Sequence, residues 1–422
     1  MHAEKETICM FTPTADGGHA RYSMELLRAM SDPPRGRWNF ELVSSENLHD
    51  EFKSDLYPVH PILPAIRDRS TFPNRFAWVV SRLMHYPRRE AGFLKWLAEQ
   101  DRLSGVHFQE WTPWLAARVF RKIHRMGKRV FYTVHNIVPH KYPKLIPKAV
   151  IHWWIRRACR EADGLFVHTE ALKQQLDRFL GPRAHAPIHV VPHGVWTIQH
   201  AADHPSLRER LAWKKLLFFG TIRRNKGLDL LLRAAERLPG YSITIAGELV
   251  DRDYFNNEIL PLVRRLQAAG VKIDLRDGFT PEDEVAPLFA SHSAVILPYT
   301  ANFMAQSGVV YLALAHELPV VSSQAGGLGD LFREFKIGET FVQYTPEALA
   351  TAVEALMASG SEAQLAEQFR LAKRRYSWQQ SAGATIAGYA AAFAERPAAD
   401  SLPADNQQQT SDDRTVETTT AQ

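Results

Sequence analysis

The sequence predicts an α/β protein that consists of two doubly wound domains. Strand-like apolar runs alternate with helix-like segments along both halves of the 422-residue chain, which favours a mostly parallel sheet with helices on its faces. Two apolar runs, one at the start of the chain and one near its middle, each lead through a glycine turn into a helix-like segment. Since such a start is typical of a doubly wound domain, we expect two domains that face each other.

The first half begins with an apolar run, a polar turn that contains Gly17 and Gly18, and a helix-like segment over Tyr22–Met30. Glycine has no Cβ, so another group can approach the backbone of this turn closely. Strands are expected in this half at Thr7–Phe11, Phe40–Val43, Gly105–Phe108, Val130–Thr133, Gly164–Val167 and Ile188–Val191.

The second half begins with the most informative pattern in the chain. Gly220-Thr-Ile-Arg-Arg-Asn-Lys-Gly227 lies between the apolar run Leu216–Phe219 and the helix-like segment Leu228–Ala235. A buried strand, a glycine turn with cations and a helix start bring backbone N–H groups and positive charge to one point, which suits a phosphate. Further strands are expected at Ser242–Ala246, Val271–Leu275, Ala294–Leu297, Pro319–Ser322 and Thr340–Gln343.

The two halves join in a polar segment that follows neither periodicity. The expected divisions are an N-terminal domain over 1–195, a linker over 196–212, a second domain over 213–378, a C-terminal helix over 379–396 that packs back on the first domain, and a tail over 397–422. The tail has five acids and one arginine from Asp400 onward and almost no large apolar side chain, so it is expected to be disordered.

Composition excludes several classes of protein. With 45% apolar and 23% charged residues, the chain is typical of a soluble globular protein that can bury two cores. No run of eighteen uncharged apolar residues occurs and the first residues are polar, so a cytoplasmic location is expected. Cys9 and Cys159 are the only cysteines, and neither has metal-ligand spacing, so no structural zinc or disulfide framework is expected.

Charge is unevenly distributed along the chain. Residues 1–200 carry 29 Lys+Arg and 19 Asp+Glu, a net charge of +10, whereas residues 201–422 carry 22 and 27, a net charge of −5. Two basic stretches rich in aromatic residues, 66–96 and 141–160, have two interpretations: ordinary solvated helix faces, or a peripheral surface for the inner face of an anionic membrane. No nucleic-acid-binding module accompanies them, so nucleic acid is not an expected partner.

Several short motifs occur in a fixed order between about residue 8 and about residue 392. They are Gly17-Gly18, Ala162–Thr169, Val190–Val195, Gly220–Gly227, Gly278-Phe279, Leu297–Tyr299, Pro319–Val321, Gly326-Gly327 and Tyr376–Trp378. The ordered set resembles the retaining glycosyltransferases of family 4, which have the GT-B fold. This resemblance implies a hexosyltransferase that uses no metal or cofactor, whose second domain would bind a GDP- or UDP-sugar and whose first domain would bind the acceptor. The basic first half of the chain motivates a further expectation: a glycan or lipid-linked glycan acceptor in cell-surface polysaccharide biosynthesis.

The resemblance also implies roles for individual residues. The catalytic set is His135, which contacts the donor sugar near the reacting carbon, and Arg223 and Lys226, which hold the diphosphate. The donor-binding set is Gly220, Gly227, Glu248, Gln306, Ser307, Gly308 and Val309. On the acceptor side of the cleft the residues are Gly17, Gly18, Asn136 and His140.

The chain departs from the pattern of this family at two places. Thr221 occupies the position of a common arginine, and Arg223 would replace it from two residues further on. Met304 and Leu312 occupy the positions of two glutamates that often contact the donor sugar and the ribose. Met304 and Leu312 leave open the alternative of a catalytically silent partner protein that binds nucleotide-sugar. A nucleotide-sugar epimerase is a second alternative, because such an enzyme can share this fold.

Overall fold

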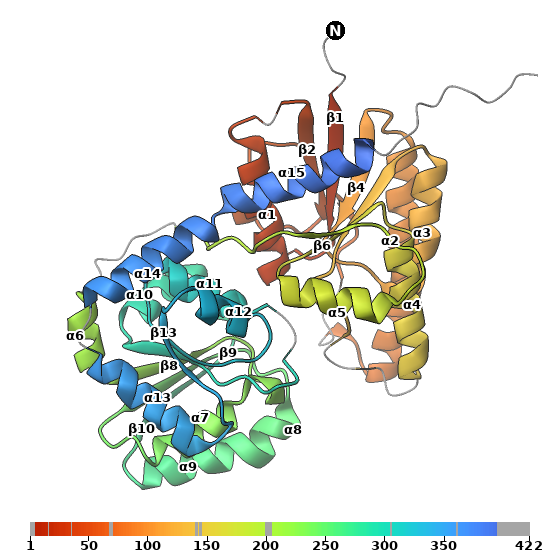
Figure 1. Ribbon diagram of the computed structural model, residues 1–422. Coiled ribbons are helices and arrows are strands. Elements are labelled where there is room, and N and C mark those ends of the chain that lie inside the picture. The colour runs from red at the N-terminus through yellow and green to blue at the C-terminus, as the bar shows by residue number, and fades with distance from the viewer. Residues whose placement is uncertain are drawn as a thin grey trace, which may run out of the picture.

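The computed structural model describes residues 5–15, 17–34, 36–66, 71–139, 142, 146–198, 205–303, 306–359 and 362–394. These residues form two lobes, and each lobe is a parallel sheet with helices on both faces (Figure 1). The expected fold class, with two doubly wound α/β units, is therefore confirmed.

The first domain contains seven parallel strands in the order β3-β2-β1-β4-β5-β6-β7. Their bounds are β1 Glu6–Thr12, β2 Trp38–Ser45, β3 Val59–Leu63, β4 Leu103–Phe108, β5 Arg129–Thr133, β6 Gly164–Val167 and β7 Ile188–Val190. The sequence did not predict β3, because Pro61 interrupts a run of only five residues. The strand tolerates this proline because it lies at the edge of the sheet, where a missing N–H costs little.

Helices cover both faces of this sheet. Their bounds are α1 Gly17–Ser31, η1 Asp50–Phe52, α2 Arg75–Ala98, α3 Pro113–Arg125, α4 Lys148–Arg160 and α5 Glu170–Leu180. Helix α2 begins where the Asn74 side chain accepts a hydrogen bond from the Ala77 N–H, at 2.8 Å. Helices α2, α3 and α4 lie next to one another along the outer side of the lobe (Figure 1).

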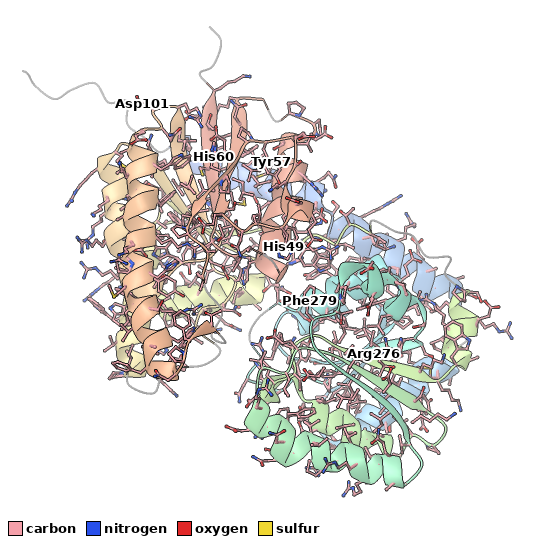
Figure 2. All side chains as sticks on the ribbon, turned by 180° about the vertical axis from the view of Figure 1, so that it is seen from behind. His49, Tyr57, His60, Asp101, Arg276 and Phe279 are labelled. Atoms are coloured by element: carbon pink, nitrogen blue, oxygen red, sulfur yellow. The ribbon has the colours of Figure 1, made fainter. Side chains whose placement is uncertain are left out.

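The second domain contains six parallel strands in the order β10-β9-β8-β11-β12-β13. Their bounds are β8 Lys215–Phe219, β9 Ser242–Gly247, β10 Lys272–Asp277, β11 Ala294–Leu297, β12 Val320–Ser323 and β13 Gly338–Phe341. All strands expected in both halves are present, with bounds that differ by at most two residues. Strand β10 is an edge strand with an exposed face, and Arg276 and the following Phe279 lie at the surface (Figure 2).

The helices of this domain pack around its sheet. Their bounds are α6 Leu207–Ala212, η3 Arg224–Lys226, α7 Leu228–Ala235, α8 Arg252–Tyr254, η4 Phe255–Ile259, α9 Leu260–Ala268, α10 Glu282–Ala290, α11 Gly308–Ala315, α12 Leu328–Glu334, α13 Pro346–Ala358 and α14 Glu362–Arg375. Throughout the described ranges, no helix is both long enough and apolar enough to cross a bilayer.

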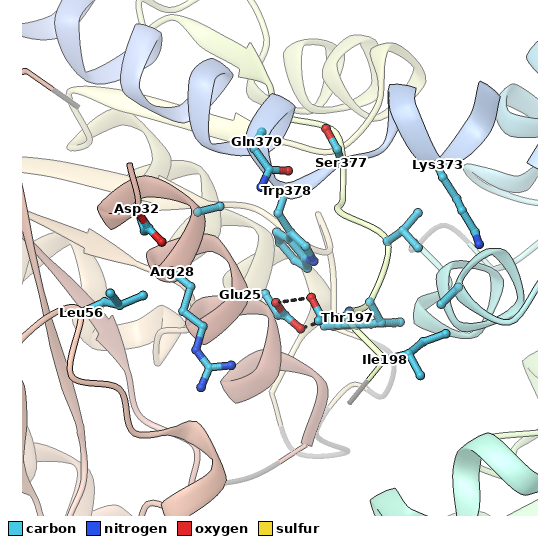
Figure 3. A pocket seen from close by; sticks show the side chains of 14 residues that line it. Glu25, Arg28, Asp32, Leu56, Thr197, Ile198, Lys373, Ser377, Trp378 and Gln379 are labelled. Carbon is cyan, nitrogen blue, oxygen red and sulfur yellow. Dashed lines mark hydrogen bonds between the residues drawn. The ribbon is translucent and has the colours of Figure 1, made fainter. Parts of the chain in front are cut away.

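The chain crosses between the lobes twice, and the two crossings touch. The first follows β7, and the second leads into α15 (Trp378–Ala394), which lies across the first domain against α1, β6 and β7 (Figure 1). A Cβ on Gly194 of the first crossing would lie 2.2 Å from the Trp378 ring of the second, so only glycine fits there. Near this point the Glu25 carboxylate of α1 accepts hydrogen bonds from Thr197 N at 3.2 Å and Thr197 Oγ1 at 2.8 Å (Figure 3).

Candidate active site in the cleft

A cavity of about 970 Å³ lies between the two lobes. Residues 136–139, which follow β5 of the first domain, line one wall, and residues 223–225, which follow β8 of the second, line the opposite wall. The carboxyl ends of the strands of both domains therefore face the same cavity. α/β proteins commonly bind ligands at these strand ends. Two segments that the sequence singled out separately border one space.

The glycine loop after β8 is pressed tightly against its neighbours. Gly227 has a φ of 65°, and a Cβ there would lie 1.9 Å from the Pro298 carbonyl oxygen. Gly247, at the end of β9, has a φ of 150°, and its Cβ would lie 2.1 Å from the Gly220 carbonyl oxygen. Any larger residue would push the loop away from the sheet edge. The glycines therefore set the position of the cations between them.

Lys226 turns inward from this loop. Its Nζ donates to the Tyr299 hydroxyl at 2.7 Å and lies 3.9 Å above the centroid of the Tyr299 ring. Tyr299 OH and Ser307 Oγ are 2.8 Å apart, so Ser307, at the start of α11, continues the hydrogen-bonded chain. Burial, with a smaller contribution from the charge of Arg223, lowers the pKa of Lys226 to about 7. Lys226 is not among the residues that line the cavity.

Arg223, in contrast, lines the cavity directly. Its Nε donates to Thr221 Oγ1 at 3.1 Å, and it forms no ion pair with any residue in the described part of the chain. Burial lowers the pKa of Arg223, while Tyr299 and the exposed Glu248 act in the opposite direction. The neighbouring Arg224 is paired with Glu258. Arg223 is therefore a half-buried cation that is available to an anion in the cleft.

The start of α11 lies beside the glycine loop. Val309 is buried and would be 3.4 Å from a Cβ on Gly220. The Gly308 carbonyl accepts a hydrogen bond from Trp196 Nε1 at 2.9 Å, and the Gln306 amide fills the space beside Gly327. Of the two unusual residues in this region, Met304 lies outside the described residues. Leu312 packs against the hydrophobic core.

His135 lies behind the cavity wall in a chain of hydrogen bonds. Its Nδ1 is 2.8 Å from His168 Nε2, and His168 Nδ1 is 3.0 Å from the Val191 carbonyl. Because a carbonyl only accepts, His168 carries its proton on Nδ1, and neutral His168 then accepts the proton of His135 Nδ1. Burial is the largest cause that lowers the pKa of His135 well below its usual value, and it lowers that of His168 to about 4.

The remaining nitrogen of His135 faces Gln109. His135 Nε2 is 3.1 Å from Gln109 Oε1, whereas Gln109 Nε2 is buried without a partner among the described residues. Turning the amide by 180° would let Gln109 donate to the unprotonated Nε2 and would satisfy both groups. His135 is therefore held as one neutral tautomer. It borders the site through Asn136, which does line the cavity.

The glycines expected on the acceptor side lie at the start of α1. Gly17 has a φ of 74°, both Gly17 and Gly18 are exposed, and a Cβ on either would meet nothing within 4 Å. Neither glycine is among the residues that line the cavity. His140 lies outside the described residues.

Three residues around the site were not assigned a role from the sequence: Tyr299, His168 and Gln109. Each follows a strand of the sheet (β11, β6 and β4), as His135 follows β5, and this position is the signal that could have identified them. Within the described ranges, no group of three or more His, Cys, Asp or Glu side chains is arranged to hold a metal ion.

Comparison with known proteins places these features in context. The family model of Glycosyltransferase Family 4 matches residues 16–197, and that of Glycosyl transferases group 1 matches residues 213–359. A D-inositol 3-phosphate glycosyltransferase of Xylanimonas cellulosilytica is 30% identical over 341 residues, which cover 73% of this chain and 77% of that protein. A glycogen synthase of Mycobacterium tuberculosis is 29% identical over 255 residues, which cover 58% of this chain and 57% of that protein.

Solved structures show the same architecture. A sucrose-phosphate synthase from Thermosynechococcus elongatus aligns with a TM-score of 0.70 at 16% identity and covers 93% of this chain and 100% of that one. Anabaena HepE in complex with UDP and glucose aligns with a TM-score of 0.64 at 14% identity and covers 91% of this chain and 99% of that one. At these identities the likeness concerns the fold.

Proposed function

This chain belongs to glycosyltransferase family 4 and has the GT-B fold, and from that premise we propose that it transfers a hexose from a GDP- or UDP-sugar to a glycan or lipid-linked glycan acceptor. The observation that carries the proposal is the cavity between the lobes, because Arg223 lines it opposite Asn136. HepE, which shares the fold, was solved with UDP and glucose. We assign the second domain to the nucleotide-sugar and the first to the acceptor.

Charge supports this assignment. A departing nucleoside diphosphate develops negative charge, and Arg223 and Lys226 would stabilise that charge in the transition state. The glycine loop carries both cations: Arg223 already lines the cavity, whereas Lys226 would turn from Tyr299 toward the diphosphate. Metal-independent catalysis is part of the proposal, since these two side chains supply the positive charge.

We propose that the configuration of the transferred sugar is retained through front-face substitution. In this step the acceptor oxygen forms the new bond to the anomeric carbon, the bond to the diphosphate breaks on the same face, and the leaving phosphate oxygen takes the acceptor proton. No carboxylate nucleophile is required, unlike the two-carboxylate route of retaining hydrolases. The protein would contribute orientation and charge stabilisation.

A membrane-bound acceptor is supported by the exposed face of α2. The apolar residues on this face recur at helical spacing: Phe76, Val79, Val80, Leu83 and Met84. Phe76 is 77% exposed, and the domain carries most of the positive charge of the chain. We therefore propose that α2 docks on the inner face of an anionic membrane during cell-surface polysaccharide synthesis.

A liposome flotation assay tests this docking. The protein should float with anionic vesicles, remain at the bottom with zwitterionic ones, and lose binding in a Phe76→Asp, Leu83→Asp variant. An exposed substitution on the opposite domain, Phe279→Asp, serves as the matched control. Equal flotation of all three proteins would remove the membrane claim.

A panel of GDP- and UDP-sugars tests the transferase itself. Release of nucleoside diphosphate that depends on an acceptor, with one donor preferred, is the expected result. Binding of donor without release would instead indicate a catalytically silent partner, an alternative favoured by the apolar Leu312. Conversion of the donor to another nucleotide-sugar without acceptor would indicate an epimerase.

A further inference from the structure

A second cavity, of about 310 Å³, lies in the first domain beside the cleft. It opens at the carboxyl ends of β1 and β4, between the segments Pro13-Thr14 and Glu110–Thr112, and α2 closes its far side with Arg82, Tyr86 and Arg89. We call it the Arg82–Arg89 pocket. None of its residues lines the cavity assigned to the donor.

Neither arginine of this pocket forms an ion pair within the described part of the chain. Arg89 is only 3% exposed, and within the described residues its side chain donates one hydrogen bond, from Nη2 to the Pro13 carbonyl oxygen at 2.5 Å. Arg82 lies over the rings of Trp78 and Tyr86, at 5.0 and 5.6 Å from their centroids. The charges of Glu110 and Glu46 act on Arg89 without a direct ion pair. A buried charge without an ion-pair partner costs folding free energy, so a bound anion would stabilise these guanidinium groups.

Other polar groups around the pocket are also unsatisfied. Thr14 Oγ1, Trp111 Nε1 and the Nε atoms of Arg82 and Arg89 are buried and have no hydrogen-bond partner among the described residues. Three of these four atoms only donate hydrogen bonds. Buried polar atoms are rarely left unpaired, and a group of donors around one space indicates a ligand with several acceptor oxygens.

The carboxyl groups of the pocket do not neutralise the arginines. Burial raises the pKa of Glu90 to about 8, so at neutral pH this side chain is mostly protonated and can donate a hydrogen bond. Glu110 lies 3.4 Å from His19 Nε2, on the side of the pocket that faces the cleft. The two arginines therefore outnumber Glu110, the other carboxyl group of the pocket.

The pocket is connected to the proposed reaction centre by short contacts. Glu110 touches His19, and the His19 ring is 4.6 Å from the His135 ring, edge to face. The Arg82–Arg89 pocket is therefore separated from His135 by only two side-chain contacts, through Glu110 and His19.

We propose that the Arg82–Arg89 pocket binds a phosphate ester carried by the acceptor, so that the protein glycosylates a phosphorylated polyol or glycan. The part that concerns the acceptor rests on the proposed transferase function, whereas phosphate binding in the pocket does not. The phosphate could belong to a soluble sugar or polyol phosphate or to a lipid headgroup. The shared chemistry is an oxyanion that accepts hydrogen bonds from two guanidinium groups.

Isothermal titration tests the pocket with two kinds of probe. The soluble arm compares D-inositol 3-phosphate with unphosphorylated inositol, and the lipid arm compares vesicles with and without phosphatidic acid. Both arms use the full chain with saturating UDP, and are repeated in an Arg223→Ala variant, so that binding at the donor cations does not contribute. Binding of UDP is measured separately. If UDP does not bind, the proposed transferase function is contradicted, whereas phosphate binding in the Arg82–Arg89 pocket is tested independently.

The pocket variants are Arg82→Gln and Arg89→Lys, and the matched control is Arg88→Gln, an exposed arginine of the same helix. We expect phosphate-dependent binding in one arm that weakens at least tenfold in Arg82→Gln and is unchanged in Arg88→Gln. Arg89→Lys keeps the buried positive charge, so any weaker binding in this variant is not caused by unfolding of the protein. The proposal is overturned if neither arm shows phosphate-dependent binding, or if Arg82→Gln and Arg88→Gln behave alike.

Discussion

At the scale of single residues, Lys226 holds its proton weakly. Its Nζ is kept against Tyr299 beside Arg223, and the pKa is lowered to about 7. A pKa lowered into this range means that part of the population lacks this positive charge near neutral pH. A diphosphate in the site would restore the proton, because negative charge raises the pKa of a nearby ammonium.

Binding of UDP should consequently take up a proton above pH 7. At pH 8, where free Lys226 is mostly neutral, we expect uptake of about one proton and an affinity that falls as the pH rises further. Isothermal titration in buffers of different ionisation enthalpy measures this uptake. Lys226→Arg, whose guanidinium does not titrate in this range, is the control and should show none. Binding of UDP at pH 8 without proton uptake by the unsubstituted protein would contradict the assignment of Lys226.

The two cations also lead to a kinetic prediction. Arg223→Ala and Lys226→Ala should each lower turnover at least tenfold, which corresponds to about 1.4 kcal/mol of transition-state stabilisation. Arg233→Ala, an exposed change on the outer side of α7, should leave turnover unchanged. Measurement of diphosphate release at saturating donor checks this, and near-normal rates in both site variants would refute the phosphate assignment.

At the scale of elements, α15 shows how one helix joins the two ends of the chain. Tyr389 is completely buried, and its hydroxyl lies 2.5 Å from Nδ1 of the buried His107. Gly388 permits this close approach, since a Cβ there would lie 2.5 Å from the Phe166 ring. Gly383 of the same helix is exposed, and its Cβ would meet nothing within 4 Å.

These two glycines provide a matched pair of substitutions. Gly388→Ala should destabilise the protein by about 1–3 kcal/mol, because the added methyl group overpacks the contact between α15 and β6. Gly383→Ala should instead stabilise it by up to about 1 kcal/mol through helix propensity. Denaturant unfolding of the two variants measures the difference. Equal effects would show that α15 is not tightly packed on the first domain.

Some elements can be predicted from their own local sequence, and others cannot. The Gly220–Gly227 loop and the strand before it are local patterns, and they occur where the sequence predicts them. Strand β3 carries no such pattern, since a short edge strand with Pro61 is stabilised by pairing with β2 rather than by its own residues.

At the scale of the whole molecule, the first crossing connects the two lobes through Trp196 and Thr197. Trp196 Nε1 donates to the Gly308 carbonyl at the start of α11, while Thr197 is held by Glu25 of α1 (Figure 3). Arg21 of α1 also lies over the Trp196 ring, 4.9 Å from its centroid. The linker thus ties the first domain to the helix start that borders the donor side of the cleft.

Loss of the hydrogen bond between Trp196 and Gly308 should weaken the binding of UDP at the donor site. Trp196→Phe removes the hydrogen bond to Gly308 but keeps an aromatic ring, and we expect a weakening of UDP binding of about threefold to tenfold, which corresponds to one hydrogen bond. Trp213→Phe, at a partly exposed tryptophan beyond the linker, is the control. UDP affinities that remain equal in the two variants would indicate that the tie does not act on the site.

The sequence by itself determined the two α/β domains, twelve of the thirteen strands and the loop that carries Arg223 and Lys226, because these features depend on apolar periodicity and glycine placement within short segments. Only the tertiary structure decided that Arg223 faces the cleft while Lys226 turns onto Tyr299. It also decided that His168 and Gln109 fix the tautomer of His135. Finally, it placed two arginines of α2 around a pocket in the first domain. The physical reason is that hydrogen bonds, burial and pKa values depend on groups far apart in the chain. Those groups meet only when the sheets, helices and crossings have packed together.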